Sequence, residues 1–126
     1  MNIEEKNRLG DLLKYEADKN FCREVITIAK GENLKMGTIL AFDTGDQCKM
    51  VTLSTADGEA KNTDTAFGIL LEDVDASTEA KKALTIARNA IVASDYLIFP
   101  DGATDDQKVK IKKDLEDRGI LVRQSA

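Results

Sequence analysis

The sequence predicts a mainly β fold with one or two short helices, the clearest of them near the C-terminus. Several short segments between residues 24 and 99 alternate between apolar and polar side chains or are rich in β-branched residues. Turn-forming glycines and aspartates separate these segments, and one stretch with helix-capping signals follows Pro100. With 126 residues, 42% of them hydrophobic and 33% charged, the chain has enough apolar side chain for one compact domain.

The N-terminal segment differs from the rest of the chain because charged residues crowd it. Leu9, Leu12 and Leu13 have the i, i+3, i+4 spacing of a single helical turn. So little apolar surface cannot offset the entropy lost when the segment becomes ordered. We therefore predict an N-terminal arm over residues 1–22, mobile or weakly docked, followed by a single β-rich domain over residues 23–126.

The first part of the domain contains three expected strands. Residues 24–29 alternate with a period of two, which predicts a half-buried strand. Residues 38–42 and 49–54 are two further β-rich runs, and the turn residues at 44–46 predict that they form a hairpin. Asp57 and Gly58 tolerate positive φ and predict another turn in a polar surface loop.

The second part of the domain begins with the most apolar run. Residues 66–71 are apolar on both faces, which predicts a central buried strand, and Gly68 within it predicts a close approach of neighbouring backbone. Two more strands are expected at residues 82–88 and 89–93, and a last one at residues 120–123.

The clearest helix follows Pro100. Thr104 has the character of an N-cap, and Gln107 three residues later completes a capping box. Ile111 and Leu115 form a narrow apolar stripe, so the helix is expected to lie on the surface of the sheet. Before the proline, Ser94 and Asp95 are expected to cap a single helical turn through Leu97, with a short strand over residues 96–99 as the alternative.

The chain lacks the usual equipment of hydrolytic enzymes. It has no histidine, which excludes Ser-His-Asp and Cys-His arrangements. Its glycines show neither the GxGxxG nor the GxxxxGK spacing of a phosphate-binding loop. We therefore expect a protein that is not an enzyme and that needs no cofactor.

The best acidic cluster is formed by Glu72, Asp73 and Asp75, which resemble paired catalytic carboxylates or ligands of a hard cation. Counted as an EF-hand loop from Asp73, the glycine position holds Thr78 and the bidentate glutamate position holds Leu84. Both requirements fail. A solvated turn at the end of a strand is the favoured interpretation, with metal binding as the alternative.

Charge and cysteine content limit the partners and the compartment. A net charge of −5 disfavours binding to nucleic acid, because the phosphate backbone would be repelled. No apolar stretch approaches the roughly 20 residues of a membrane span, and the N-terminus lacks the apolar region of a signal peptide. Cys22 and Cys48 make no disulfide framework, so we expect buried thiols in a protein made in a reducing cytoplasm.

A series of motifs in a fixed order carries a resemblance to a known family. The series runs through residues 23–25 (REV), 37–41 (GTILA), 66–70 (AFGIL) and 98–100 (IFP), with an acidic turn and a strand pair before the last of these. A capped lysine-rich helix and a terminal strand follow. From Phe21 to the C-terminus, the chain resembles the lambda head decoration protein family of tailed phages and prophages.

The resemblance implies a β-clip-like domain that assembles as a homotrimer and binds the major capsid protein. It implies a cement protein on the outer surface of the virion, at threefold positions of the expanded icosahedral head, which stabilises the head against the pressure of packaged genome. The host bacterial cytoplasm would be the place of synthesis. The N-terminal segment does not match the lambda arm residue by residue, so contact residues cannot be transferred from the family.

Physical reasoning therefore selects the contact residues in the arm. An arm that adds to a β-partner gains backbone hydrogen bonds and side-chain pockets, less the cost of ordering. Leu12, Leu13, Tyr15 and Phe21 are the expected apolar anchors on the capsid. The alternative, equally open at this point, is that some of them pack on their own domain.

Two other functions remain as alternatives. A trimeric β-fold nucleotide hydrolase would take its acid from the turn at residues 71–77, but the glycine-rich phosphate loop is missing. A phage tail or baseplate accessory protein would keep the structural role and change the docking site. The absence of a long coiled-coil pattern counts against that second alternative.

Overall fold

The computed structural model describes residues 12–16, 22–42, 47–52 and 65–124, and within them the fold is mainly β with one α-helix near the C-terminus. The elements, in chain order, are β1 (Leu13–Glu16), β2 (Arg23–Ile28), β3 (Glu32–Leu34), β4 (Ile39–Phe42), β5 (Gln47–Met50), β6 (Gly68–Leu70), β7 (Val74–Ala76), β8 (Lys81–Ile86), β9 (Ala90–Ala93), the 3-10 turn η2 (Ser94–Tyr96), α3 (Asp105–Asp117) and β10 (Ile120–Arg123). The predicted fold class is confirmed. The turns expected at residues 44–46 and 57–58 lie outside the described residues.

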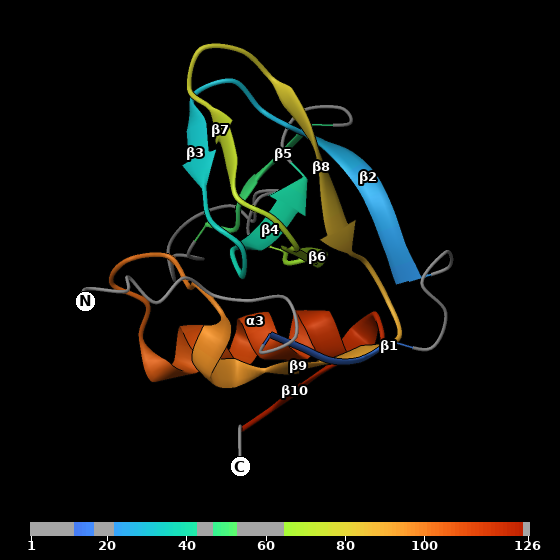
Figure 1. Ribbon diagram of the computed structural model, residues 1–126. Helices are drawn as coiled ribbons and strands as arrows, with labels where there is room; N and C mark the ends of the chain where they lie inside the picture. The colour runs from blue at the N-terminus through green and yellow to red at the C-terminus, as the bar shows by residue number, and fades with distance from the viewer. Residues whose placement is uncertain (1–11, 17–21, 43–46, 53–64, 125–126) are drawn as a thin grey trace, which may run out of the picture.

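A small closed barrel forms the centre of the domain, with its strands in the order β2-β5-β4-β6-β8 (Figure 1). The alternation predicted for β2 is present, because Ile26 and Ile28 are buried while Val25 is 66% exposed. The predicted hairpin is also confirmed, since β4 and β5 pair antiparallel. Strand β5 begins and ends earlier than the sequence suggested. Closure of the barrel leaves no free edge among these five strands.

Strand β6 is the buried central strand that the apolar run predicted. It pairs antiparallel with β4 on one side and with β8 on the other. A Cβ atom on Gly68 would lie 2.6 Å from the carbonyl oxygen of Ile86 and 3.1 Å from the hydroxyl of Thr85. That hydroxyl is itself buried and donates to the carbonyl of Ile69 at 2.8 Å. There is therefore no room for a side chain at position 68.

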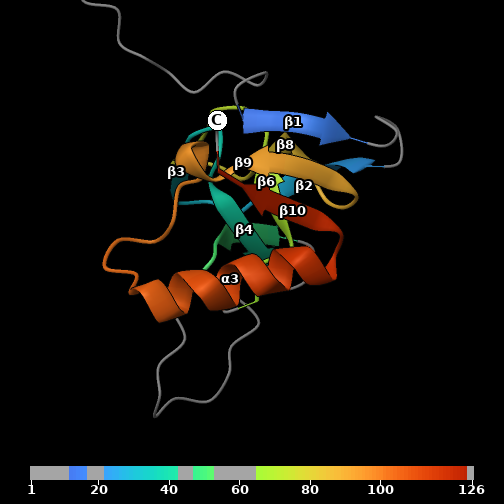
Figure 2. The ribbon, with the colours of Figure 1, turned by 90° about the horizontal axis from the view of Figure 1, so that it is seen from below.

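A second, three-stranded sheet lies against one end of the barrel and carries the helix (Figures 1 and 2). Its order is β1-β9-β10, with β1 antiparallel and β10 parallel to β9. The capping box predicted for α3 is confirmed, with Thr104 and Gln107 each accepting from the other's backbone N–H. Ile111 and Leu115 are buried in the core, as their spacing predicted.

The connection between α3 and β10 is tightly packed against the corner between β8 and β9. Gly119 has φ +83°, and a Cβ atom there would lie 2.5 Å from Oδ1 of Asn89. Asn89 is also left-handed, with φ 52°, a conformation that asparagine tolerates better than most residues. Two turns far apart in sequence therefore fit together through their backbones.

Two very short strands were not predicted from the sequence. β3 and β7 form a separate antiparallel ribbon, in which Asn33 faces Asp75. No strand was expected between residues 29 and 38, and residues 72–75 were expected to form a turn. Three-residue strands show too little alternation to be recognised, and their pairing across the chain creates them.

The segment before Pro100 combines both alternatives: residues 94–96 form the helical turn η2, and Ile98 then makes a parallel β-bridge to Thr38. The residue that precedes the turn is Ala93, and no side chain caps it. The cap expected from Ser94 and Asp95 is therefore wrong: both lie within the turn itself. Backbone contacts hold the turn, with Leu97 N–H donating to the carbonyl of Ser94 at 3.2 Å.

Two groups of buried side chains form the core, and each contains one cysteine. Cys22 belongs to the group that includes Leu12, Ile111 and Leu115, whereas Cys48 belongs to the group around Ile28. Both cysteines are reduced and fully buried, as expected. Within the described ranges, no helix is long and apolar enough to cross a membrane.

Candidate docking surfaces

The structure separates the residues that were expected to contact the capsid. Leu12 is fully buried in the core, and Leu13 packs against the same group of side chains. Tyr15 is 57% exposed. Phe21 lies outside the described residues. Of the three that are described, Tyr15 therefore presents most of its surface to solvent, and Leu12 presents none.

Strand β1 is built into the domain by pairing and by an ion pair. Its register with β9 shifts between Leu13 and Tyr15, which directs the two side chains differently. Glu16 then accepts two hydrogen bonds from Arg23 of β2, at 2.8 and 2.7 Å, with both side chains less than one-fifth exposed. A bidentate arginine–carboxylate pair fixes both geometry and orientation. Residues 12–16 thus pair with the domain, within the segment expected to form the arm.

The acidic cluster holds loops in place, a role that was not predicted from the sequence. Oε2 of Glu72 accepts from the backbone N–H of Leu84 at 2.7 Å, and Oδ1 of Asp73 accepts from that of Met36 at 2.8 Å. Asp75 accepts from the N–H of Ser77 at 3.0 Å and from its hydroxyl at 2.5 Å. The Ser77 hydroxyl, followed by its backbone N–H, holds the pKa of Asp75 below its usual range.

These three carboxylates do not converge on one point. Each binds the backbone of a different segment. In the part of the chain that the structure describes, no three metal-ligating side chains lie close enough to hold an ion. Glu72 and Asp73 lock neighbouring segments to each other, and such intramolecular bonds are a structural use of acidic residues.

A group of side chains that the sequence did not reveal connects the barrel with the C-terminal end of α3. The guanidinium carbon of Arg118 lies 5.7 Å from the centroid of the Phe67 ring. Phe67 stacks on Phe42, with ring centroids 4.3 Å apart and an interplanar angle of 27°. We call these three residues the Arg118 stack. Phe67 is buried, while Phe42 at its outer end is 37% exposed.

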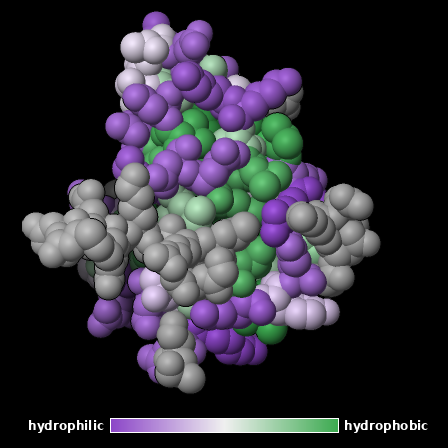
Figure 3. Space-filling model, in the orientation of Figure 1, coloured by the Kyte–Doolittle hydropathy of each residue, from purple (hydrophilic) through white to green (hydrophobic). Residues whose placement is uncertain are grey.

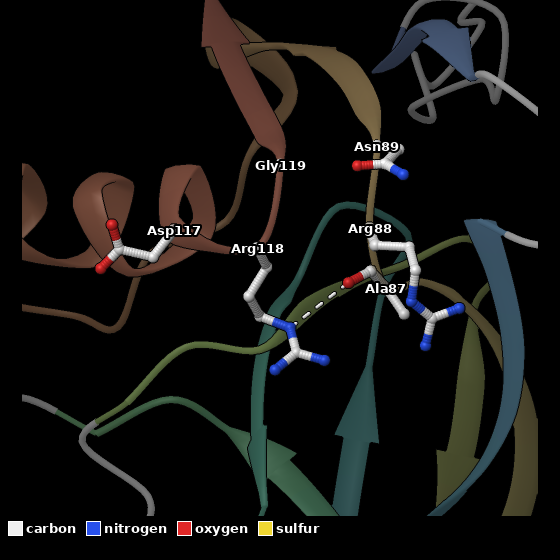
Figure 4. A pocket seen from close by; sticks show the side chains of 6 residues that line it. All are labelled: Ala87, Arg88, Asn89, Asp117, Arg118 and Gly119. Atoms are coloured by element: carbon white, nitrogen blue, oxygen red, sulfur yellow. Dashed lines mark hydrogen bonds between the residues drawn. The ribbon is translucent and has the colours of Figure 1, made fainter.

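Beside the Arg118 stack is an open pocket of about 460 Å³. It is lined by residues 87–89, at the corner between β8 and β9, and by residues 117–119, at the end of α3. Nε of Arg118 donates to the carbonyl of Ala87 at 3.3 Å (Figure 4). Arg88 lines the pocket as well, and its guanidinium pairs with Glu24. The pocket is therefore lined by two arginines, one paired with a carboxylate and one bound to a backbone carbonyl.

Two other features of the surface are simpler. Lys108 and Lys112 of α3 lie over the ring of Phe99, at 5.5 and 6.0 Å from its centroid. Phe99 packs against the core. The face shown in Figure 3 has hydrophobic surface in the region of β2 and β8. In β2, Val25 is the most exposed large apolar residue, at 66%. Single exposed apolar residues are normal on a protein surface.

Comparison with known proteins gives a clear family match. Residues 2–120 match the family described as bacteriophage lambda head decoration protein D. The match covers most of the chain and, unlike the motifs read from the sequence, also includes the N-terminal segment. No curated protein matches the chain. On the strength of that match, the chain belongs to the bacteriophage lambda head decoration protein D family.

Proposed function

We propose that this protein is a cement protein that binds as a homotrimer at threefold positions of an expanded icosahedral head and reinforces it against packaged genome. The family match over residues 2–120 is the observation that carries this proposal. A decoration family implies association with the phage capsid and a place on the virion. To this we add four proposals: the trimer, its threefold position, the major capsid protein as partner, and synthesis in the host cytoplasm.

Avidity explains how such a protein would bind firmly. One short arm that becomes ordered on the capsid binds weakly, because ordering consumes much of the interaction free energy. A trimer presents three arms to three equivalent sites, and linked binding strengthens attachment by roughly 10²- to 10⁴-fold. Matching of the symmetry of trimer and lattice then supplies specificity as well as strength.

Strand β1 attaches the arm to the domain at a defined place. Leu12 in the core and the Glu16–Arg23 ion pair anchor β1 on the domain. We therefore assign capsid contact to residues before Leu12, together with Tyr15 and Phe21. Leu12 and Leu13 serve as the anchor of β1, since contact of Leu12 with the capsid would require β1 to leave β9.

Deletion of residues 1–11 tests the arm without disturbing β1. Purified expanded heads are mixed with full-length or truncated protein and sedimented, and bound protein is measured. We expect the truncated protein to bind at least tenfold more weakly while its thermal unfolding midpoint is unchanged, because the core keeps Leu12. Equal binding by the two proteins would refute the arm mechanism.

Electron microscopy of the decorated heads tests the position independently. Added density at threefold positions supports the proposal. Density elsewhere on the head, or on the tail, contradicts it and favours a tail or baseplate accessory role.

A further inference from the structure

Arg118 is held in place but pairs with no carboxylate among the described residues. Arg23 binds Glu16 through two hydrogen bonds, and Arg88 pairs with Glu24. Arg118 instead donates from Nε to a backbone carbonyl and lies over an aromatic ring. Of the five N–H donors of a guanidinium, these contacts use one.

The remaining donors of Arg118 are positioned to bind a planar anion. Figure 4 shows its guanidinium extending into the pocket, with the two terminal nitrogens directed away from Ala87 and with the Asp117 carboxylate pointing elsewhere. The Nε hydrogen bond and the contact with the Phe67 ring restrict the positions that the guanidinium can take. A side chain that is ordered beforehand loses little entropy on binding, and its fork matches the two oxygens of a carboxylate.

The surroundings of Arg118 have the composition of a protein interface. Arginine and aromatic residues are enriched at interfaces and among the residues that contribute most to binding. Phe42 reaches the surface at the outer end of the Arg118 stack and is held there by Phe67. Phe42 does not line the pocket, but Phe67 links it to Arg118, so this part of the surface combines a charged contact with a partly exposed aromatic ring.

We propose that this pocket receives an aspartate or glutamate side chain from a neighbouring copy of this chain. The proposal rests on the homotrimer of the proposed function. Charge complementarity supports a second copy as the partner, since the chain has 23 acidic residues against 18 basic ones and a net charge of −5. In a ring of three, each interface joins two different surfaces, so all three Arg118 side chains can meet carboxylates without facing one another.

Self-association measured without heads tests this proposal. Analytical ultracentrifugation of the full chain over a range of concentrations compares wild type with Arg118→Glu, Arg118→Lys and the matched control Lys113→Glu. Lys113 is exposed on α3 outside the pocket, so its variant changes charge by the same amount. Because charge reversal breaks the ion pair and repels the incoming carboxylate, we expect Arg118→Glu to weaken association by about 10²-fold or more.

Two further results decide the interpretation. Arg118→Lys keeps the charge but loses the fork, and we expect association about tenfold weaker than wild type. If Arg118→Glu does not fold, the association measured for Arg118→Lys tests the proposal alone. Three results would each overturn the proposal. The first is a trimer as stable as wild type in Arg118→Lys and in any folded Arg118→Glu. The second is equal weakening of association by Lys113→Glu, and the third is a wild-type chain that stays monomeric. Since no heads are present, failure here is distinguishable from failure of head binding.

Discussion

Gly68 occupies a position in the barrel that has no room for a methyl group. Gly68→Ala would place Cβ 2.6 Å from a backbone oxygen of β8, which cannot move without disturbing the sheet. We expect the free energy of unfolding to fall by about 1–3 kcal/mol, as measured by urea denaturation.

The control for Gly68 is Gly102, where glycine allows a positive φ and where there is room for a side chain. Gly102 has φ +80°, and a Cβ atom there would have no other atom within 4 Å, so Gly102→Asn meets no contact and asparagine tolerates the backbone. We expect a change within about 0.5 kcal/mol in the free energy of unfolding. An equal loss in the two variants would show that steric contact with Ile86 is not the cause.

The pKa of Asp75 depends on Ser77. Because the serine hydroxyl is the largest cause of its lowered pKa, Ser77→Ala should raise that pKa towards 3.8, as followed by NMR titration of the carboxyl carbon. A lowered folded-state pKa stabilises the protein above the unfolded pKa, and this contribution is lost as the pH falls through the folded value. The variant should therefore lose less stability than wild type on acidification below about pH 4. An unchanged titration would refute the hydrogen bond.

Local interactions were predictable at the scale of residues, and distant ones were not. The capping box of Thr104 and Gln107 involves residues three apart, and the stripe of Ile111 and Leu115 follows from helical spacing. Arg118 contacts a carbonyl 31 residues away and a ring still farther away. Nothing in the sequence around Arg118 distinguishes it from other surface cations, so the pocket required the structure.

At the scale of elements, β1 is where sequence and structure differ most usefully. A charged segment with three leucines was expected to be an arm because its own apolar surface cannot order it. The rest of the domain supplies what the segment lacks, since β9 offers hydrogen bonds and the core accepts Leu12. Tertiary pairing of this kind is not encoded in local spacing.

Substitutions in β1 separate its anchoring residue from its exposed one. Leu12→Ala removes a fully buried side chain, and we expect a loss of about 2–5 kcal/mol in the free energy of unfolding of the free protein. Tyr15→Ala, at a position 57% exposed, should cost about 0.5 kcal/mol or less while weakening head binding. Denaturation and head sedimentation measure the two effects. Comparable destabilisation by both would contradict the assigned roles.

At the scale of the whole molecule, the barrel strands connect the two parts of the core. Neighbouring residues on β4 and on β6 belong to different groups, with Ile39 and Ile69 in one and Leu40 and Leu70 in the other. Because the same strands form both groups, neither can lose its packing alone. We therefore expect one cooperative unfolding transition.

The two cysteines report on this cooperativity. Cys22 is buried in one group and Cys48 in the other, so both thiols become reactive only when their own group opens. Thiol labelling across a urea series, read by mass spectrometry of each peptide, should give the same midpoint for both residues. Two separate midpoints would show that the groups unfold independently.

The pairing around β9 brings the start of β1 and the end of β10 together at one end of a single strand. Leu13 at the start of β1 is paired with Val92, and Arg123 at the end of β10 is paired with Ala93. Chain entering β1 and chain leaving β10 therefore pass the same end of one strand. A load applied between Leu13 and Arg123 would therefore act first on the β1-β9-β10 sheet, at the end of β9 that carries Ala93.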